Sequence, residues 1–332
     1  MNTIKVAPIN DQDIVRPLWS VIIPTFNCSQ YLKETIESVL MQDPGVENME
    51  IWVVDDCSQE NPKHIVDDLG KGRINFYRQE RNVGQLNNFN TCLNLAKGKI
   101  IHLLHGDDFV HAGFYESLKT IVSNNNIGAG FTGHYKVNQT GAVLNSSQAL
   151  ATSPGVIEDF LALILKKQVI ETPSIVVKRE VYEKLGAFNK DLSWVEDWEM
   201  WVRIACKFKF YYEPAHLASY RVHDSSNTAD SIITGRFIED AAKAIKVISV
   251  YLNFPENKKK QLINSSKEYY LNYAIHQGIY RKSWRILSRC TLLVYNFSSA
   301  LKLLKYFTIL LKVRVKNFLP SQKKKRISEF HQ

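Results

Sequence analysis

Two different spacings of apolar residues alternate over the first 125 residues of the chain. Short apolar runs bounded by turn-forming residues are typical of buried strands. Apolar residues that recur every three or four positions are typical of helices with one face on a core. The expected strands are residues 19–26, 48–55, 74–77 and 99–104, and the expected helices are one capped by Ser29, then residues 62–69 and 86–96. This alternation predicts a parallel sheet with right-handed crossovers.

The remainder of the chain is less regular. We expect strands at 128–137 and 174–178, helices at 157–167 and 197–206, and helices throughout from about residue 230 to 319. The fold class is therefore α/β, with a mostly parallel sheet flanked by helices and a helical C-terminal extension. We expect one domain over residues 1–228 and a helical C-terminal region over residues 229–332.

Composition narrows the class of protein. A chain of 332 residues that is 45% apolar can bury a large α/β core. The five cysteines are scattered and form no CxxC pair, which argues against a disulfide framework and against a zinc site. The sequence has no apolar run of signal-peptide or membrane-spanning length. We therefore expect a cytoplasmic protein that is neither secreted nor membrane-spanning.

The net charge of +9 is unevenly divided. Residues 281–332 carry +12, from 13 basic residues and one acid, so residues 1–280 carry −3. In the tail, apolar residues from Ala300 to Phe318 share one helical face, lysines occupy the opposite face, and a basic cluster follows at 323–326. This pattern predicts an amphipathic helix that binds an anionic membrane surface. The alternative is an ordinary surface helix; nucleic acid is not expected, because no base-reading module accompanies the charge.

Two acidic clusters each close an apolar run, at Asp55-Asp56 and at Asp107-Asp108. Ligands of parallel sheets bind at the carboxyl ends of the strands, so we expect both clusters to face one site. A carboxylate at the end of the second strand can accept a hydrogen bond from the ring N–H of uracil or thymine. Asp107 and Asp108 suit Mg²⁺ or Mn²⁺, which are held by carboxylates together with substrate phosphates. The alternative is that these acids are solvated turn residues or helix caps.

These residues also carry a family resemblance. The segments VIIPTFNCSQYLKETIESVLMQ, VVDDCS, NVGQLNNFNTCLNLAKGKIIHLLHGDD and ETPSIVVKREVYEKLGAFNKDLSWVEDWEMWVRIA occur in this order between residues 19 and 225. The chain resembles a family 2 inverting glycosyltransferase of the GT-A fold and of the bacterial surface-polysaccharide type. By that resemblance the nucleotide-binding residues are Pro24, Thr25, Asn27, Asp55, Asp56, Asn82, Gly84, Asn90 and Asp107.

The chain departs from the family pattern in two places. The resemblance implies metal coordination by Asp108 and Asp107, but His105 or Gly106 stands where the family motif begins with Asp. Phe89, before Asn90, occupies a position at which the family usually has Arg. We therefore expect metal coordination to rest mainly on one carboxylate and another cation to serve the diphosphate.

A third group of residues opens a helix at Glu196-Asp197. Glycosyl transfer with inversion needs a base that takes the proton of the acceptor hydroxyl. By the resemblance this base is Asp197, with Glu196 as the alternative. The structural alternative is that both acids only favour the helix amino terminus through its dipole. Trp194, just before the helix, is a candidate for stacking on an acceptor sugar.

A Tyr-Arg-x-His segment closes a predicted strand at residues 220–223. By the resemblance, Arg221 and His223 lie near the diphosphate. Arg221 would balance phosphate charge, and His223 would ligate the metal or donate to phosphate.

The resemblance as a whole implies a hexosyltransferase-type enzyme that uses a UDP-sugar, with dTDP- and GDP-sugars as alternatives. The expected acceptor is a hydroxyl of a glycan or of a polyprenyl-diphosphate-linked glycan at the inner face of the cell membrane, as in O-antigen or capsule assembly. Two other classes were weighed. A Rossmann dehydrogenase would need a glycine pattern that PTFNCSQ lacks. A non-catalytic nucleotide-sugar-binding or membrane scaffold protein would not need Asp55, Asp108 and Asp197 together.

Overall fold

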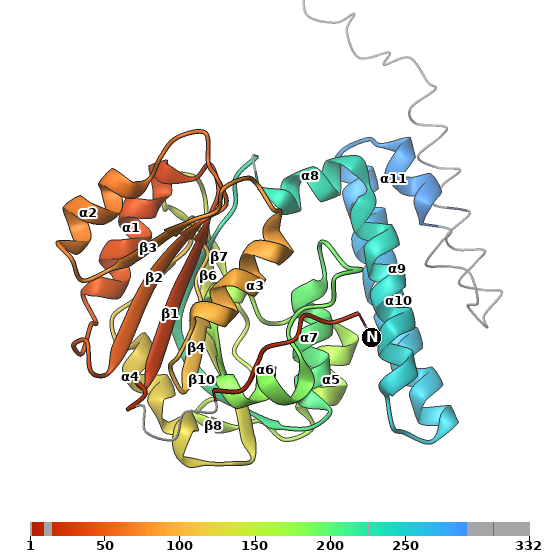
Figure 1. The fold of residues 1–332 in the computed structure, drawn as a ribbon. Coiled ribbons are helices and arrows are strands. Elements are labelled where there is room, and N and C mark those ends of the chain that lie inside the picture. Colours follow the sequence, from red (N-terminus) through yellow and green to blue (C-terminus); the bar gives the residue numbers. More distant parts are fainter. Residues whose placement is uncertain (1, 10–14, 225, 291–307, 309–332) are drawn as a thin grey trace, which may run out of the picture.

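The computed structural model describes residues 2–9, 15–224, 226–290 and 308 (Figure 1). The strands are β1 (Trp19–Thr25), β2 (Met49–Asp55), β3 (Asn75–Arg78), β4 (Ile100–Leu103), β5 (Phe109–Val110), β6 (Ile127–Val137), β7 (Val143–Ser146), β8 (Gly155–Val156), β9 (Ile175–Lys178) and β10 (Lys209–Arg221). The α-helices are α1 (Ser29–Leu40), α2 (Lys63–Gly70), α3 (Gln85–Leu95), α4 (Phe114–Leu118), α5 (Phe160–Lys166), α6 (Arg179–Leu185), α7 (Glu196–Ala205), α8 (Asn227–Thr234), α9 (Arg236–Tyr251), α10 (Glu256–Tyr280) and α11 (Trp284–Arg289). Two 3₁₀ turns lie at Lys119–Ser123 and Thr172–Ser174.

The strands form a central sheet in the order β3-β2-β1-β4-β9-β6-β10-β5. The four strands predicted in the first 125 residues are present, and they pair in parallel as expected. Beyond β4 the sheet is mixed: β10 runs parallel to β6, whereas β9 is antiparallel to both β4 and β6. The α/β class is confirmed.

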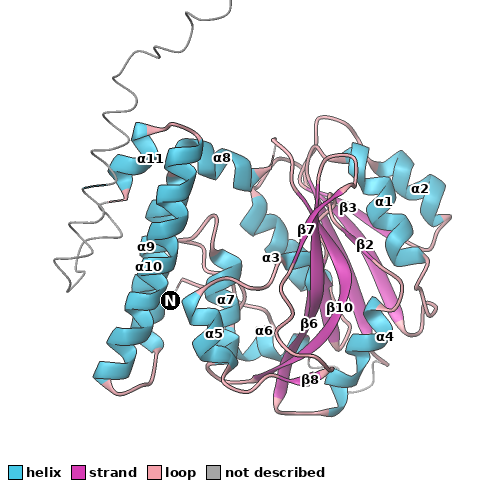
Figure 2. Ribbon diagram, turned by 180° about the vertical axis from the view of Figure 1, so that it is seen from behind, coloured by secondary structure: helices cyan, strands magenta, loops and turns pink. Residues whose placement is uncertain are grey.

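Each face of the sheet has its own apolar core because successive side chains of a strand point to opposite faces. On β1, Ile22 packs into the core covered by α3 and α5 to α7, while Val21 and Ile23 pack into the core covered by α1, α2 and α4. The two helical layers are visible on either side of the sheet in Figures 1 and 2. A strand buried on both faces explains why the first apolar runs are continuous rather than alternating.

The predicted helical C-terminal region is confirmed as far as the described residues reach, by α8 to α11. Helices α9 and α10 lie side by side and pack against α5 and α7, so they share the apolar core of that face (Figure 1). The predicted domain boundary at residue 228 lies within α8, and the division into two domains stays a prediction.

The predicted basic amphipathic helix near 300–318 lies outside the described residues except for residue 308, and the cluster at 323–326 lies wholly outside them. Among the helices described, none has the length and apolar character needed to cross a bilayer.

Candidate active site

The carboxyl end of β1 joins the two acidic clusters. The Asp56 amide donates to the Thr25 carbonyl at 2.9 Å, and the Gly106 amide donates to the Pro24 carbonyl at 3.0 Å. A side chain at Gly106 would place its Cβ only 3.1 Å from the Thr25 Cβ, so the second cluster depends on glycine for this close approach. The parallel pairing of β1 with β2 and β4 therefore brings both clusters to one edge of the sheet, as predicted.

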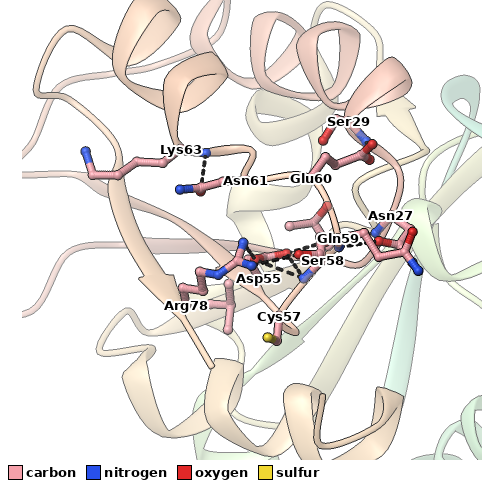
Figure 3. Close-up of polar contacts among 12 residues, drawn as sticks. Asn27, Ser29, Asp55, Cys57, Ser58, Gln59, Glu60, Asn61, Lys63 and Arg78 are labelled. Carbon is pink, nitrogen blue, oxygen red and sulfur yellow. Dashed lines mark hydrogen bonds and ion pairs between the residues drawn. The ribbon is translucent and has the colours of Figure 1, made fainter. Parts of the chain in front are cut away.

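Asp55 is fully buried and bonded on both carboxylate oxygens (Figure 3). Arg78 donates to Oδ2 at 2.6 Å, and the Ser58 amide and hydroxyl donate to the same carboxylate. Asn27 is attached to this group: its amide donates to the Ser58 hydroxyl, and its side-chain oxygen accepts from the Gln59 amide. The Asp55 charge is thus neutralised by Arg78, which holds the loop after β2 in a fixed shape.

Asp56 organises the next loop. Its two carboxylate oxygens accept from the amides of Val83 and Gly84 at 2.7 and 3.0 Å, and Gly84 also donates to the Asn82 side chain. Gly84 has φ +84°, a conformation that favours glycine, at the start of α3. The family's asparagine and glycine positions here thus act together with Asp56.

A pocket of about 520 Å³ adjoins this loop, lined in part by Arg81, Asn82, Asn87 and Asn90. Its lining therefore includes two of the predicted nucleotide-binding residues, Asn82 and Asn90, together with the positively charged side chain of Arg81. Phe89, which replaces the family's arginine, is buried instead and stacks on the His105 ring at a centroid distance of 5.2 Å.

His105, Asp107 and Asp108 form a group that could hold a metal ion, since each offers a ligand atom within 4.8 Å of the others. Asp108 is almost fully buried; its Oδ1 accepts from the Arg221 amide at 2.8 Å, while its Oδ2 has no hydrogen-bond partner among the described residues and lies 3.9 Å from His105 Nδ1. The Nε2 atom of His105 is likewise buried and without a partner in the described part of the chain. Buried carboxylate and imidazole atoms without hydrogen-bond partners are energetically unfavourable unless they bind an ion. The set of ligand atoms therefore fits a divalent cation.

The pKa values of the residues in this group are consistent with metal binding. Burial, reinforced by the neighbouring Asp107 charge, raises the pKa of Asp108 well above its usual range, and a bound cation would offset this effect. Burial also acts to raise the pKa of Asp107, but the hydrogen bond with His223 and the nearby imidazole rings outweigh it, so that pKa is lowered. Burial lowers the pKa of His105, which keeps the imidazole neutral as a ligand must be.

Arg221 and His223 lie beside these acids. His223 Nε2 is 2.9 Å from Asp107 Oδ2. The Arg221 guanidinium is buried and donates to the carbonyls of Asp107, Asn138 and Gln139 and to the Glu34 carboxylate. In this arrangement Arg221 holds the acidic loop in place. Its contact with a diphosphate stays a prediction.

Glu196 and Asp197 open α7 and are bonded to different parts of the chain. Gln85, the first residue of α3, donates to Glu196 Oε1 at 3.0 Å, while Glu196 Oε2 is buried without a partner among the described residues. Gln168 donates to Asp197 Oδ2 at 2.8 Å, and the Trp198 amide donates to Oδ1. Because Gln85 follows Gly84, the Asp56 loop and the start of α7 are joined through two consecutive residues.

Both acids have raised pKa values. Burial and the charge of Glu171 raise the pKa of Asp197 to about 7. Burial and the charge of Asp197 raise the pKa of Glu196 to about 8. The Glu171 charge also raises the pKa of Asp108, so the start of α7 and the metal-binding group lie within electrostatic range of one carboxylate. Acids poised near neutrality are suited to proton transfer.

Trp194 lies among aromatic residues of the C-terminal helices. Its ring stacks on Tyr273 with a centroid distance of 6.1 Å and meets Phe237 edge-on at 5.3 Å. It is only partly buried. Its contact with an acceptor sugar stays a prediction.

Several residues of this site were missed by sequence reasoning: Arg78, Gln85, Gln168 and Glu171. Arg78 had a usable signal, because it ends β3 in register with Asp55 of the neighbouring parallel strand. The other three lie on loops or at a helix start, where no periodicity indicates which side chains will meet. His105 was noted only as a departure from the family motif.

Comparison with known proteins agrees with the family resemblance of the sequence. The family model for glycosyl transferase family 2 matches residues 20–186. An uncharacterized glycosyltransferase of Methanocaldococcus jannaschii is 29% identical over 217 residues, which cover 64% of this chain and 73% of the relative. One from Haemophilus influenzae is 26% identical over 249 residues, covering 71% and 75%.

Solved structures share the fold. Staphylococcus aureus TarS 1–349 in complex with UDP-GlcNAc matches with a TM-score of 0.66 and 16% identity, covering 90% of this chain and 92% of that one. The mannosyltransferase PcManGT of Pyrobaculum calidifontis, in complex with GDP-Man and Mn²⁺, matches with a TM-score of 0.54 and 18% identity, covering 94% and 89%. The expected GT-A fold is confirmed by the TarS likeness.

The metal-binding group generates a first prediction. Asp108→Asn should remove the increase in UDP affinity that Mn²⁺ produces, because the amide is a poorer ligand for a hard cation than the carboxylate. Arg221→Lys should lower Mn²⁺ affinity by about 10- to 100-fold, as expected when a residue that orients a ligand is changed. Calorimetric titration of UDP with and without Mn²⁺ measures both effects. Asp67→Asn, an exposed acid on α2, is the matched control, and an unchanged Mn²⁺ effect in Asp108→Asn would refute the assignment.

Proposed function

The chain belongs to glycosyl transferase family 2, and on this basis we propose that it moves one sugar from a UDP-linked donor to an acceptor hydroxyl, with inversion at the anomeric carbon. The observation that carries this proposal is that a group able to hold a metal ion, at the edge of the sheet, and a pair of carboxyls with pKa values near neutrality both lie within electrostatic range of Glu171. A scaffold or sugar-binding protein would have no use for buried acids without full hydrogen bonding.

The nucleoside of the donor would lie at the ends of β1 and β2. Thr25, Asp55 and Asp56 border this edge, and the pocket beside it is lined by Asn82 and Asn90. A UDP donor is supported by the likeness to TarS, which was solved with UDP-GlcNAc, while GDP-Man in PcManGT supports the GDP alternative. The pyrimidine preference rests on the chemistry of a carboxylate that accepts a ring N–H. It requires the base to reach Asp55, which in this structure is fully buried and bonded to Arg78 and Ser58.

Asp108, Asp107 and His105 would hold a divalent cation, Mn²⁺ or Mg²⁺, with His223 bonded to Asp107. When bound, such an ion supplies positive charge beside the departing diphosphate. The buried unpartnered Oδ2 of Asp108 is the observation that supports this assignment.

Asp197 would act as the base. It accepts the acceptor hydroxyl proton as the hydroxyl oxygen bonds to the anomeric carbon, and the bond from that carbon to the diphosphate oxygen breaks with both electrons leaving on UDP. A single displacement inverts the anomeric centre and needs no covalent enzyme intermediate. Gln168 fixes the Asp197 carboxylate, and Glu196 beside it is the alternative base.

The acceptor we propose is a glycan or polyprenyl-diphosphate-linked glycan at the inner face of a membrane, as in O-antigen or capsule assembly, with the protein peripherally bound. The basic C-terminal sequence supports this. The turn between α10 and α11 supports it too: Tyr280 is 77% exposed and Trp284 46% exposed, next to the exposed Arg281, Lys282 and Arg285. Exposed aromatic rings flanked by cations are typical of membrane-interface surfaces.

Asp197→Asn should lower the transfer rate by at least about 100-fold, because the amide cannot accept the proton. UDP affinity should be unchanged, since Asn keeps the shape of the side chain, its oxygen can still accept from the Trp198 amide, and the Gln168 amide can turn its oxygen toward the new NH2 group. Radiolabelled sugar transfer and calorimetric UDP binding measure the two effects. Asp191→Asn, an exposed acid a few residues earlier, should behave as wild type, and near-normal turnover by Asp197→Asn would exclude Asp197 as the base.

The transfer rate should fall as pH decreases through about 7, because the base works only when deprotonated and the pKa of Asp197 is raised to about 7. Glu171→Gln removes a negative charge that raises this pKa, so its acid limb should move to lower pH. The profile of kcat against pH measures both. Glu158→Gln, at an exposed position, is the control. An acid limb near pH 4 in the wild type would contradict the raised pKa.

Deletion of residues 298–332 should release the protein from vesicles that contain anionic lipid, because each basic residue near such a surface contributes about 1 kcal/mol of attraction. Flotation of full-length and truncated protein with anionic vesicles measures the loss, and neutral phosphatidylcholine vesicles provide the control. Equal binding of both forms to anionic vesicles would refute the membrane role of the tail.

A further inference from the structure

A single carboxylate oxygen of α9 holds the segment that precedes α7. Asp240 Oδ2 accepts from the backbone amides of Ser193, Trp194 and Val195 at 2.9, 2.7 and 3.2 Å. Asp240 is only 5% exposed. A buried carboxylate with three amide donors is a strong, charge-assisted arrangement.

This contact anchors the chain immediately before α7 rather than capping its first turn. The residue before α7 is Val195, which has no side-chain oxygen, and α7 shows no side-chain cap of its own. Asp240 instead accepts from the amides of the three residues that precede the helix, which lie 45 to 47 residues away in sequence.

The same segment has two further attachments to the C-terminal helices. Asn227 of α8 donates to the Ser193 carbonyl and also to Gln85, which itself donates to Glu196. The Trp194 ring packs on Phe237, three residues before Asp240 on α9. The start of α7 is therefore held to the C-terminal helices as well as to α3.

We propose that Asp240 is a positioning residue for the transfer reaction: it fixes the start of α7, and with it the direction of the Asp197 and Glu196 carboxylates toward the acceptor. This inference rests on the proposed function. It assigns to the helical C-terminal region a direct influence on the chemistry of the sheet edge.

The charged groups around the two acids define what a pH measurement reports. Glu196 faces Asp197 and Asp240, and both charges raise its pKa. Asp197 faces Glu171, whose carboxylate is paired with Lys136 at 2.6 Å, and the Tyr270 hydroxyl of α10 lies within its field. Removal of the Asp240 charge should therefore lower the pKa of Glu196 and leave in place the Glu171–Lys136 pair, whose carboxylate acts on Asp197.

Hydrogen–deuterium exchange of Asp240→Ala tests directly whether Asp240 holds the segment before α7. The amides of residues 193–195 lose their acceptor, so a peptide covering residues 193–199 should exchange faster while peptides from β1 are unchanged. Asp230→Ala, an exposed acid of α8 paired with Arg236, removes a carboxylate from the same region without touching this segment and is the control. Unaltered exchange over residues 193–195 in Asp240→Ala would show that Asp240 does not hold this segment and would overturn the proposal.

Kinetics test its consequence. In Asp240→Ala we expect kcat to fall by about 10- to 100-fold through misplacement of the base, with donor KM and UDP affinity unchanged. A purely structural role would lower the folded fraction but leave the kcat of the folded enzyme unchanged. Folded Asp240→Ala with wild-type kcat overturns the positioning role.

Asp240→Asn serves if the alanine variant does not fold. It keeps the shape and one acceptor oxygen but removes the charge, so we expect a smaller but measurable loss of kcat with donor KM unchanged; wild-type kcat together with unaltered exchange over residues 193–195 overturns the proposal. Wild-type protein that neither transfers nor hydrolyses UDP-sugars would instead overturn the proposed function itself, a result that the exchange measurement does not depend on.

Discussion

The site depends on the position of β1 between two parallel neighbours. Parallel strands end at the same edge of a sheet, so residues that follow β2 and β4 become neighbours although they are far apart in sequence. The Thr25 carbonyl then accepts a hydrogen bond from the Asp56 amide, and the Pro24 carbonyl accepts one from the Gly106 amide. These two bonds fix the positions of the acidic clusters relative to each other. A change of register by one residue would turn every side chain of β1 to the opposite core and separate the clusters.

Of the four aspartates at this edge, Asp55, Asp56 and Asp108 are buried and Asp107 is half-buried, and their surroundings differ. Asp55 is neutralised by Arg78, Asp56 is satisfied by backbone amides, and Asp107 is bonded to His223. Asp108 alone keeps a buried oxygen without a partner among the described residues. A carboxylate can be taken out of water at low cost only if other charges or donors replace the water. The residue that lacks such replacement is therefore the one best placed to bind an ion.

The extent to which the sequence predicts this protein follows from the range of the interactions. Strands β1 to β4 and their helices follow from local apolar spacing, and the acids at their ends follow from topology. The mixed half of the sheet does not, because β6, β9 and β10 pair across long separations that leave no periodic signal. Phe89 and Arg221 show the same limit, because the residue type does not reveal which neighbours distant segments contribute. Phe89 stacks on His105, and Arg221 bonds to main-chain carbonyls.

The same reasoning applies to the start of α7, where local signals are weakest and long-range contacts are most numerous. Helix α7 begins after a valine, carries acids whose burial is unfavourable, and has no cap of its own. It is held there by Gln85 from α3, Gln168 from the loop after α5, and Asp240 from α9. None of these segments alone fixes the carboxylates, so their geometry exists only once the sheet and the C-terminal helices have packed together. The helical C-terminal region is in this sense part of the site, even though it contributes none of the acids.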